Sequence, residues 1–254
     1  MPSNATSAHP LRAALATGPV RGLWSTAGSA MAAEHVARLG LDFICVDEQH
    51  GFHAEPTPAL LRAIDTGGAT PLVRVASNEP SLVGRALDAG ARGVVVPMVE
   101  TPADAARAVA ACRYQPAGQR SYGPLRLSGV LGTGDPAAVE RDVLCLVMIE
   151  TRGALESLVE IAATPGLDGL FVGPADLALS MGLPLALPDP AAEHTEAVAR
   201  IRAIAQEASL VAAIHCGDGA TARRRIDEGF DLVTLGEDLA LLGAAVTREL
   251  GHSA

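Results

Sequence analysis

Eight short apolar runs, separated by segments with helical spacing, are the feature that most constrains the fold of this chain. The runs have the length of buried strands, and the segments between them are rich in Ala, Leu and Arg. Strands that alternate with helices form parallel sheets, and eight such units in 254 residues fit one closed barrel. The expected strands are residues 21–25, 42–47, 71–75, 93–97, 143–149, 168–173, 211–215 and 231–236. The sequence therefore predicts an α/β protein with a parallel, eight-stranded (β/α)8 TIM barrel.

The alternating pattern also predicts the domain organisation. Residues 1–18 lack it and are expected to form an N-terminal arm, and residues 19–254 form a single barrel domain without a linker or an internal repeat. One long connection, about 115–139, is rich in Gly and Pro, and we expect it to be irregular. Loops of that length are usually functional lids or disordered linkers.

Charge and cysteine usage exclude several classes of partner. A net charge of −10 is unfavourable for binding nucleic acid, whose phosphates are negative. No uncharged apolar run is long enough to span a membrane, and the N-terminal residues lack the layout of a secretion signal. Four cysteines far apart, with no CxxC pair, indicate reduced and mostly buried thiols. We therefore expect a cytoplasmic protein.

The chain contains no lysine, since all of its 19 basic residues are arginine. Chemistry that needs a side-chain amine is excluded, including Schiff-base aldolases, enzymes that use pyridoxal phosphate, and nucleotide hydrolases with a phosphate-binding lysine. We expect neither PLP nor NAD as a cofactor. An enzyme with this composition that stabilises an enolate must use a metal ion or hydrogen bonds.

Two acidic residues come at the ends of successive expected strands. Glu150 ends the run VMIE, and Asp176 follows the run GLFV in GLFVGPAD. A single acid after a strand is usually an ordinary acid at the start of a helix. Because the carboxyl ends of parallel strands meet at one rim, however, the two acids together form the oxygen ligand set that a hard divalent cation requires.

Polar residues also follow the second and third strands. Asp47, Glu48, Gln49 and His50 come after the second, and Arg74 lies between valines in LVRV. A lone histidine there is more often a loop residue than a base. A buried arginine is costly unless it is paired, so Arg74 needs a carboxylate from the protein or from a substrate, and its planar fork suits bidentate binding.

Six segments, in this order and spacing, resemble a known family: VDEQHG, PLVRV, LDAGARGVVVPMVET, GQRSYGPLR, VMIET and GLFVGPADLALSMG. They are similar to the class II pyruvate aldolases of the HpcH/HpaI (4-hydroxy-2-oxoheptanedioate aldolase) family, over about residues 20 to 245. The resemblance implies a barrel assembled as a homohexamer, a trimer of dimers, in which neighbouring subunits exchange the last helix.

The resemblance also implies a metal site and a catalytic pair. Glu150 and Asp176 would hold a divalent cation such as Mg, Mn or Co. Arg74 would touch the ketone oxygen of the substrate. His50, paired with Asp88, would move the proton through a metal-bound water.

A further segment would bind the substrate carboxylate. The resemblance assigns this role to Gly173, Pro174, Ala175 and Asp176, with the backbone N–H groups of Ala175 and Asp176 as donors, which suits an anion at the start of a helix.

Two positions depart from the family pattern. Gln49 stands where an acid commonly precedes the histidine, and Met148 stands where a glutamine commonly precedes the metal-binding glutamate by two residues. Both changes remove polar function near the metal, and we expect them to alter specificity rather than to abolish activity.

The expected activity is that of an aldehyde-lyase. It would cleave a 4-hydroxy-2-oxo acid to pyruvate, or hydroxypyruvate, and an aldehyde. The alternatives are an oxaloacetate decarboxylase, a lyase for acyl-CoA thioesters such as malyl-CoA, or a non-catalytic barrel. A CoA substrate predicts a basic groove, but the only basic cluster, Arg223 to Arg225, fits a solvated helix face better.

Five other residues are weaker candidates. His215 next to Cys216 at a strand end is interpreted as a buried pair rather than as a nucleophile and base. His53 can assist or replace His50. Arg120 and Arg126 in the long connection either gate the site and bind a distal carboxylate or lie on the surface.

Overall fold

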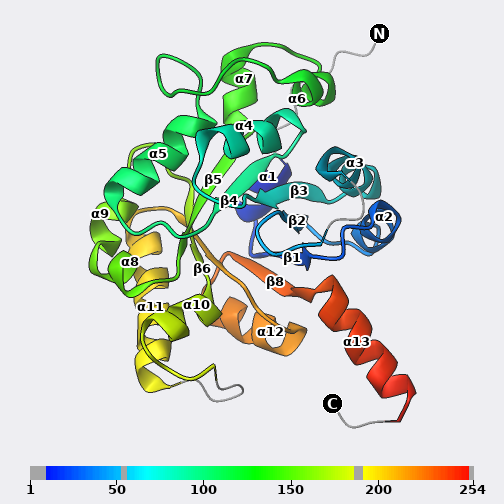
Figure 1. Cartoon of the computed structure of the whole chain (residues 1–254), viewed down its shortest axis with the longest axis vertical. Helices are drawn as coiled ribbons and strands as arrows, with labels where there is room; N and C mark the ends of the chain where they lie inside the picture. Colours follow the sequence, from blue (N-terminus) through cyan, green and yellow to red (C-terminus); the bar gives the residue numbers. More distant parts are fainter. Residues whose placement is uncertain (1–9, 53–55, 186–190, 252–254) are drawn as a thin grey trace.

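The computed structural model describes residues 10–52, 56–185 and 191–251. Its centre is a closed barrel of parallel strands that follow one another in chain order from β1 to β8 (Figure 1). The strands are β1 Val20–Ser25, β2 Phe43–Asp47, β3 Thr70–Arg74, β4 Gly93–Val96, β5 Leu144–Ile149, β6 Gly169–Val172, β7 Val211–Ile214 and β8 Leu232–Glu237. The predicted TIM barrel is confirmed, and every predicted strand end lies within one residue of the observed one.

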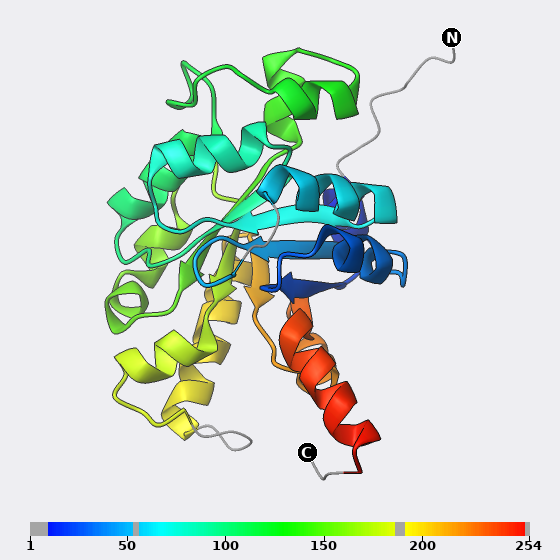
Figure 2. The ribbon, with the colours of Figure 1, turned by 45° about the vertical axis from the view of Figure 1, so that its right-hand side comes forward.

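Helices follow the strands and cover the outside of the barrel (Figures 1 and 2). They are α1 Pro10–Leu15, α2 Ala30–Ala37, α3 Thr57–Gly67, α4 Pro80–Asp88, α5 Pro102–Cys112, α6 Leu125–Leu131, α7 Pro136–Arg141, α8 Arg152–Glu156, α9 Leu158–Ala162, α10 Pro174–Ser180, α11 Ala192–Glu207, α12 Gly219–Asp227 and α13 Asp238–Glu249. No helix of the described residues is long and apolar enough to cross a membrane.

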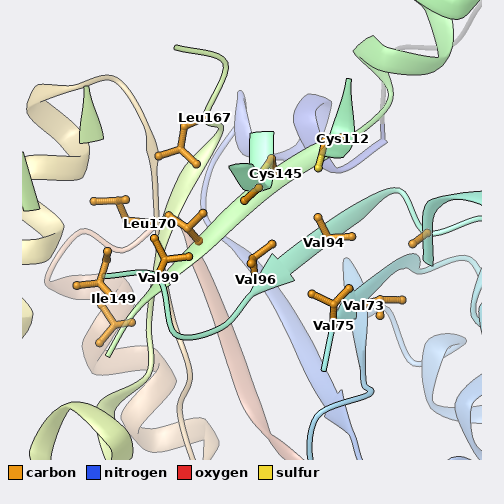
Figure 3. Packing of buried hydrophobic residues seen from close by; sticks show 14 of the residues in the cluster. Val73, Val75, Val94, Val96, Val99, Cys112, Cys145, Ile149, Leu167 and Leu170 are labelled. Atoms are coloured by element: carbon orange, nitrogen blue, oxygen red, sulfur yellow. The ribbon is translucent and has the colours of Figure 1, made fainter. Parts of the chain in front are cut away.

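The strands bury both of their faces, so the barrel has two apolar layers. Side chains that point outward, such as Val94, Val96 and Leu170, pack between the barrel and the helices (Figure 3). Side chains that point inward fill the barrel, and they include Phe43 and Phe171. Few aromatic residues are available, so Val, Leu, Ile and Ala supply most of both layers. The interior is therefore a packed core, and any site must lie at one of its ends.

One end of the barrel is closed by α1. Leu11 is buried and packs in the same cluster as Val20 and Leu144, which begin their strands. Arg12 donates to Asp168 Oδ1 at 2.7 Å and to the carbonyl of Val143 at 3.0 Å. This helix lies within the range assigned to the N-terminal arm, whose boundary stays a prediction. Because α1 covers the end where strands begin, the opposite end is left for a site.

The long connection between β4 and β5 is more ordered than predicted. Residues 115–139 were expected to be irregular, but α6 and the start of α7 lie there. Each helix is held by one fully buried apolar residue, Leu127 in α6 and Val139 in α7. Gly and Pro in this stretch mark the turns around the two helices rather than the absence of structure.

Replacing Phe171 with alanine tests the role of the barrel core. This ring is fully buried and its centroid lies 5.5 Å from that of Trp24. We expect Phe171→Ala to lower the free energy of unfolding by about 3–5 kcal/mol, because the cavity cannot collapse inside a closed barrel. Urea denaturation measures this. Phe52→Ala is the matched control, since Phe52 is 88% exposed and its loss should change stability by less than about 0.5 kcal/mol.

Candidate active site

Polar residues occupy the inward positions at the end of the barrel where the strands finish. Along each strand every second side chain points inward, so the position two after a core residue lies one level nearer this rim. Five residues stand two positions after an inward core residue and so lie at the rim. They are Asp47 after Cys45, Arg74 after Leu72, Glu150 after Met148, Gly173 after Phe171 and His215 after Ala213. The strand ends therefore place acids, a guanidinium and an imidazole around one opening.

Arg74 is paired with an acid of the protein. Its Nε donates to Asp47 Oδ1 at 2.8 Å and its Nη2 donates to Asp47 Oδ2 at 2.6 Å. The two residues are direct neighbours in the register of β2 and β3. Trp24 Nε1 also donates to Asp47, at 3.2 Å, and the Trp24 ring lies 5.0 Å from Arg74 Cζ. The sequence left open whether the partner of Arg74 is protein or substrate, and the structure shows that Asp47 is a partner.

This pairing orients Arg74 without using all of its donors. Burial opposes ionisation of Asp47, but the hydrogen bonds and charge of Arg74 outweigh it and hold the pKa of Asp47 below its ordinary value. Asp47 engages Nε and Nη2, and in the part of the chain that the structure describes Nη1 has no acceptor. One face of a fixed, positively charged group is therefore available to a ligand.

Glu150 is buried at the rim with one oxygen unsatisfied. Oε1 accepts a hydrogen bond from the backbone N–H of Met98 at 2.7 Å. Oε2 is buried and has no hydrogen-bond partner among the described residues. Met98 has a φ of 55°, a conformation that costs a residue with a side chain about 1–3 kcal/mol. The strained backbone at Met98 thus places its N–H within hydrogen-bond distance of Oε1, while Oε2 is left able to bind a ligand.

Gly173 makes room for the Glu150 carboxylate. A Cβ at position 173 would lie 2.4 Å from Oε2, so any other residue there would displace the carboxylate. Burial raises the pKa of Glu150, and the charge of nearby Asp176 raises it further. Two acids that repel each other, one of them with an orphan oxygen, fit a divalent cation.

Asp176 completes this pair from the first turn of α10, where its side chain is exposed. Across the described residues no group of three or more His, Cys, Asp or Glu side chains is placed to hold a metal. A cation here would take its remaining ligands from substrate and water, which is how Mg²⁺ is usually bound.

The structure does not join His50 to Asp88. His50 is exposed in the turn after β2, and its backbone N–H, like that of Gln49, donates to Asp47 Oδ1. Asp88 ends α4 and accepts from Arg120 Nη2 at 2.9 Å. No hydrogen bond connects the two residues within the described chain, and their pairing stays a prediction.

The other candidates have mostly structural contacts. Arg120 is buried, with its Cζ 4.8 Å from the Tyr114 ring centroid. Arg126 pairs with Asp65 and donates to the carbonyl of Gly90 at 3.3 Å. His53 lies outside the described residues.

The basic cluster on α12 is only partly solvated. Arg225, which was expected on a solvated face, is buried, and it pairs with Glu228 Oε2 at 2.7 Å. Arg224 approaches the same acid at 3.8 Å. These pairings do not favour a groove for the phosphates of CoA.

Sequence reasoning missed the contribution of three residues. Trp24 supports both Asp47 and Arg74, and Met98 donates to Glu150. His215 is not fully buried next to Cys216 but keeps 24% of its side chain exposed, with its ring centroid 5.3 Å from that of Trp24. For Trp24 and His215 a signal existed, because each lies at the rim end of a strand. For Met98 no residue pattern reveals a left-handed φ.

Comparisons with known proteins agree with this geometry. The family model described as HpcH/HpaI aldolase/citrate lyase matches residues 21–245. A hydroxypyruvate/pyruvate aldolase from Rhizorhabdus wittichii is 42% identical over 232 residues, which cover 91% of this chain and 92% of the relative. The crystal structure of an HpcH/HpaI aldolase/citrate lyase family protein from Burkholderia cenocepacia J2315 is 35% identical, covers 96% of this chain and 98% of its own, and has a TM-score of 0.83.

A more distant structure shares the fold. It is a citrate lyase beta subunit from M. tuberculosis, complexed with oxaloacetate and magnesium, which is 18% identical and covers 87% of this chain and 93% of its own with a TM-score of 0.57. The family model matches most of the chain, and the acids, the arginine and the barrel rim described above agree with it. The chain therefore belongs to the HpcH/HpaI aldolase/citrate lyase family and is a class II aldolase.

Proposed function

We propose that the protein reversibly cleaves a 4-hydroxy-2-oxo acid into pyruvate, or hydroxypyruvate, and an aldehyde. The observation that carries this proposal is the pairing of Glu150, which has an orphan buried oxygen, with Asp176 at the same rim as the fixed guanidinium of Arg74. The similarity to a hydroxypyruvate/pyruvate aldolase over nearly the whole chain supports pyruvate or hydroxypyruvate as the oxo-acid product.

The residues of the chain divide the work as follows. Cleavage removes the proton of the 4-hydroxyl, breaks the C3–C4 bond and moves that electron pair onto the 2-oxo oxygen as an enolate. A proton returned to C3 then gives pyruvate, or hydroxypyruvate. Arg74 Nη1 would donate to that oxygen as its negative charge develops, and Asp47 keeps the guanidinium in place. His50 would accept the hydroxyl proton through a water molecule, in the role that Asp88 was expected to support. The N–H groups of Ala175 and Asp176, after Gly173 and Pro174, would bind the carboxylate.

Glu150 and Asp176 would hold a divalent cation such as Mg, Mn or Co. The unpartnered Oε2, the space kept by Gly173 and the all-oxygen donor set fit such an ion. When bound, the cation supplies Lewis acidity toward the 2-oxo group. Met148 adds no polar group, since it lies buried in the barrel interior one level below Glu150.

The apolar surface of α13 supports assembly with further copies of this chain. Leu239, Leu241, Leu242, Val246 and Leu250 are all exposed on or after this helix. No residue of α13 is buried, and the helix projects away from the barrel (Figures 1 and 2). An amphipathic helix with no burial of its own needs a partner surface. We propose that α13 docks on a second copy, within a hexamer that is a trimer of dimers.

We also propose a cytoplasmic location. Cys45, Cys112, Cys145 and Cys216 are all free and buried, and this supports a reducing compartment.

The first prediction from the proposed function concerns the enolate-forming half of the reaction. In D2O with Mg²⁺, Mn²⁺ or Co²⁺, the protein should exchange the methyl protons of pyruvate for deuterium, as followed by NMR. Because no aldehyde is needed, the assay isolates the pyruvate site. Glu150→Gln and Asp176→Asn should each slow exchange at least about 100-fold, since each removes a ligand or charge that stabilises the enolate.

Glu156→Gln is the matched control for the first variant, because Glu156 is exposed at the end of α8 and should leave exchange unchanged. Exchange that persists at the wild-type rate in both site variants would contradict the assignment of the two acids. Absence of exchange in wild-type protein with metal bound would overturn the pyruvate reaction itself.

A second prediction concerns metal and thermal stability. At a metal concentration 100 times the dissociation constant, binding should add about 2.7 kcal/mol, which raises Tm by roughly 5–10 °C in a chain of this size. Glu150→Gln should lose this shift. Its metal-free form should be at least as stable as metal-free wild type, because burial and Asp176 disfavour a charge at this position. A metal-dependent shift of wild-type size in Glu150→Gln would exclude Glu150 as a ligand.

A third prediction concerns α13. Leu242→Glu should convert the assembly to smaller species, as measured by light scattering after size-exclusion chromatography, because a charge would be buried in the proposed contact. Leu39→Glu is the control, since Leu39 is also exposed but lies in the turn after α2. Wild-type protein that elutes as a monomer would refute the proposed assembly.

A further inference from the structure

The ends of β7 and β8 place two more polar side chains at the barrel opening. His215 directly follows β7 at an inward position, and its backbone N–H donates to the carbonyl of Val172 at 3.1 Å, beside Gly173. Glu237 ends β8 and pairs in register with Trp24 of β1. The Trp24 ring contacts Arg74 as well as His215. The two side chains therefore belong to the same opening as Arg74, but neither has a role in the mechanism above.

The hydrogen bonds of Thr234 determine which nitrogen of His215 carries a proton. The Thr234 hydroxyl donates its single proton to the carbonyl of Cys216 at 2.9 Å and accepts from the Cys216 N–H at 2.7 Å. His215 Nδ1 lies 3.3 Å from the Thr234 hydroxyl oxygen. The contact of the hydroxyl with the Cys216 carbonyl is the shorter of the two, so we assign the hydroxyl proton to that carbonyl and assign Nδ1 as the donor to the hydroxyl oxygen. In the neutral ring Nε2 is then an acceptor.

Nε2 faces a second acceptor. Glu237 Oε1 lies 3.6 Å from it, which is longer than a hydrogen bond. Burial, with the positive charge of Arg74, lowers the pKa of His215 to about 4, so the ring is neutral at pH 7 and the two groups are not an ion pair. Two acceptors that face each other without a proton between them attract donor groups and repel a carboxylate.

We propose that His215 and Glu237 form the binding site for the hydroxyl groups of the aldehyde, and so select hydroxylated aldehydes over plain or carboxylated ones. This inference rests on the proposed aldolase function. Neighbouring hydroxyls of such an aldehyde donate one proton each, one to Nε2 and the other to the Glu237 carboxylate. The oxo acid is excluded from this position because its own carboxylate offers only acceptors. It binds instead toward Arg74, whose Nη1 is left available by the pairing with Asp47.

The experiment compares two aldehydes that differ in their hydroxyl groups. With pyruvate and metal, kcat/KM is measured for glyceraldehyde and for propanal, and the ratio of the two values is the readout. His215→Phe and Glu237→Leu should each lower this ratio about tenfold, the size expected for one lost hydrogen bond. His215→Gln and Glu237→Gln, which each keep a side-chain acceptor, should recover part of the ratio. Glu196→Leu is the matched control for Glu237→Leu, since Glu196 is exposed on α11.

The outcomes separate this inference from the function on which it rests. An equal loss for both aldehydes would mean that the two residues only maintain the shape of the rim, and an unchanged ratio in both variants would mean that they do not contact the aldehyde. Either result overturns the inference while pyruvate exchange in wild-type protein still supports the aldolase. Absence of that exchange in wild type overturns both.

Discussion

Closure of the barrel is the constraint on which the rest of the structure depends. Once eight parallel strands close, every second side chain must point into a space that only packed side chains can fill. Phe43, Phe171 and their apolar neighbours fill that space, and α1 closes one end of it. Polar chemistry is then restricted to the last inward level, where solvent and ligand can reach it. Arg74, Glu150 and His215 share a rim because each lies two residues beyond a core position on its strand.

Charge near a closed apolar core has to be compensated, and this rim does so in two different ways. Arg74 is compensated by Asp47, which takes two of its nitrogens, and the pair is supported by Trp24. Glu150 is compensated only in part: a strained Met98 supplies one donor to Oε1, and Oε2 next to Gly173 is buried without a hydrogen-bond partner among the described residues. A site whose own groups were all satisfied would have little to offer a ligand. The incomplete compensation of Glu150 is therefore the more informative of the two arrangements.

The sequence predicts the parts of this structure that follow from periodicity. Strand ends came within one residue, and the placement of Arg74, Glu150 and Asp176 at one end of the barrel follows from their position after apolar runs. Contacts made by loops were not predictable. Asp88 accepts a hydrogen bond from Arg120, which comes from a connection that was expected to be irregular. The positive φ of Met98 and the protonation of His215 depend on backbone geometry and on Thr234, and neither leaves a spacing pattern in the sequence.

Trp24 gives the molecule a built-in optical probe. It is the only tryptophan in the chain, and its indole contacts Arg74, His215 and Asp47 at once. Its emission therefore reports on one location, without the background from other indoles that complicates fluorescence in most proteins of this size. Charge arriving next to Arg74 changes the electric field across the ring, and displacement of water at the rim changes its polarity. Occupancy of the opening is thus readable from unlabelled protein in real time.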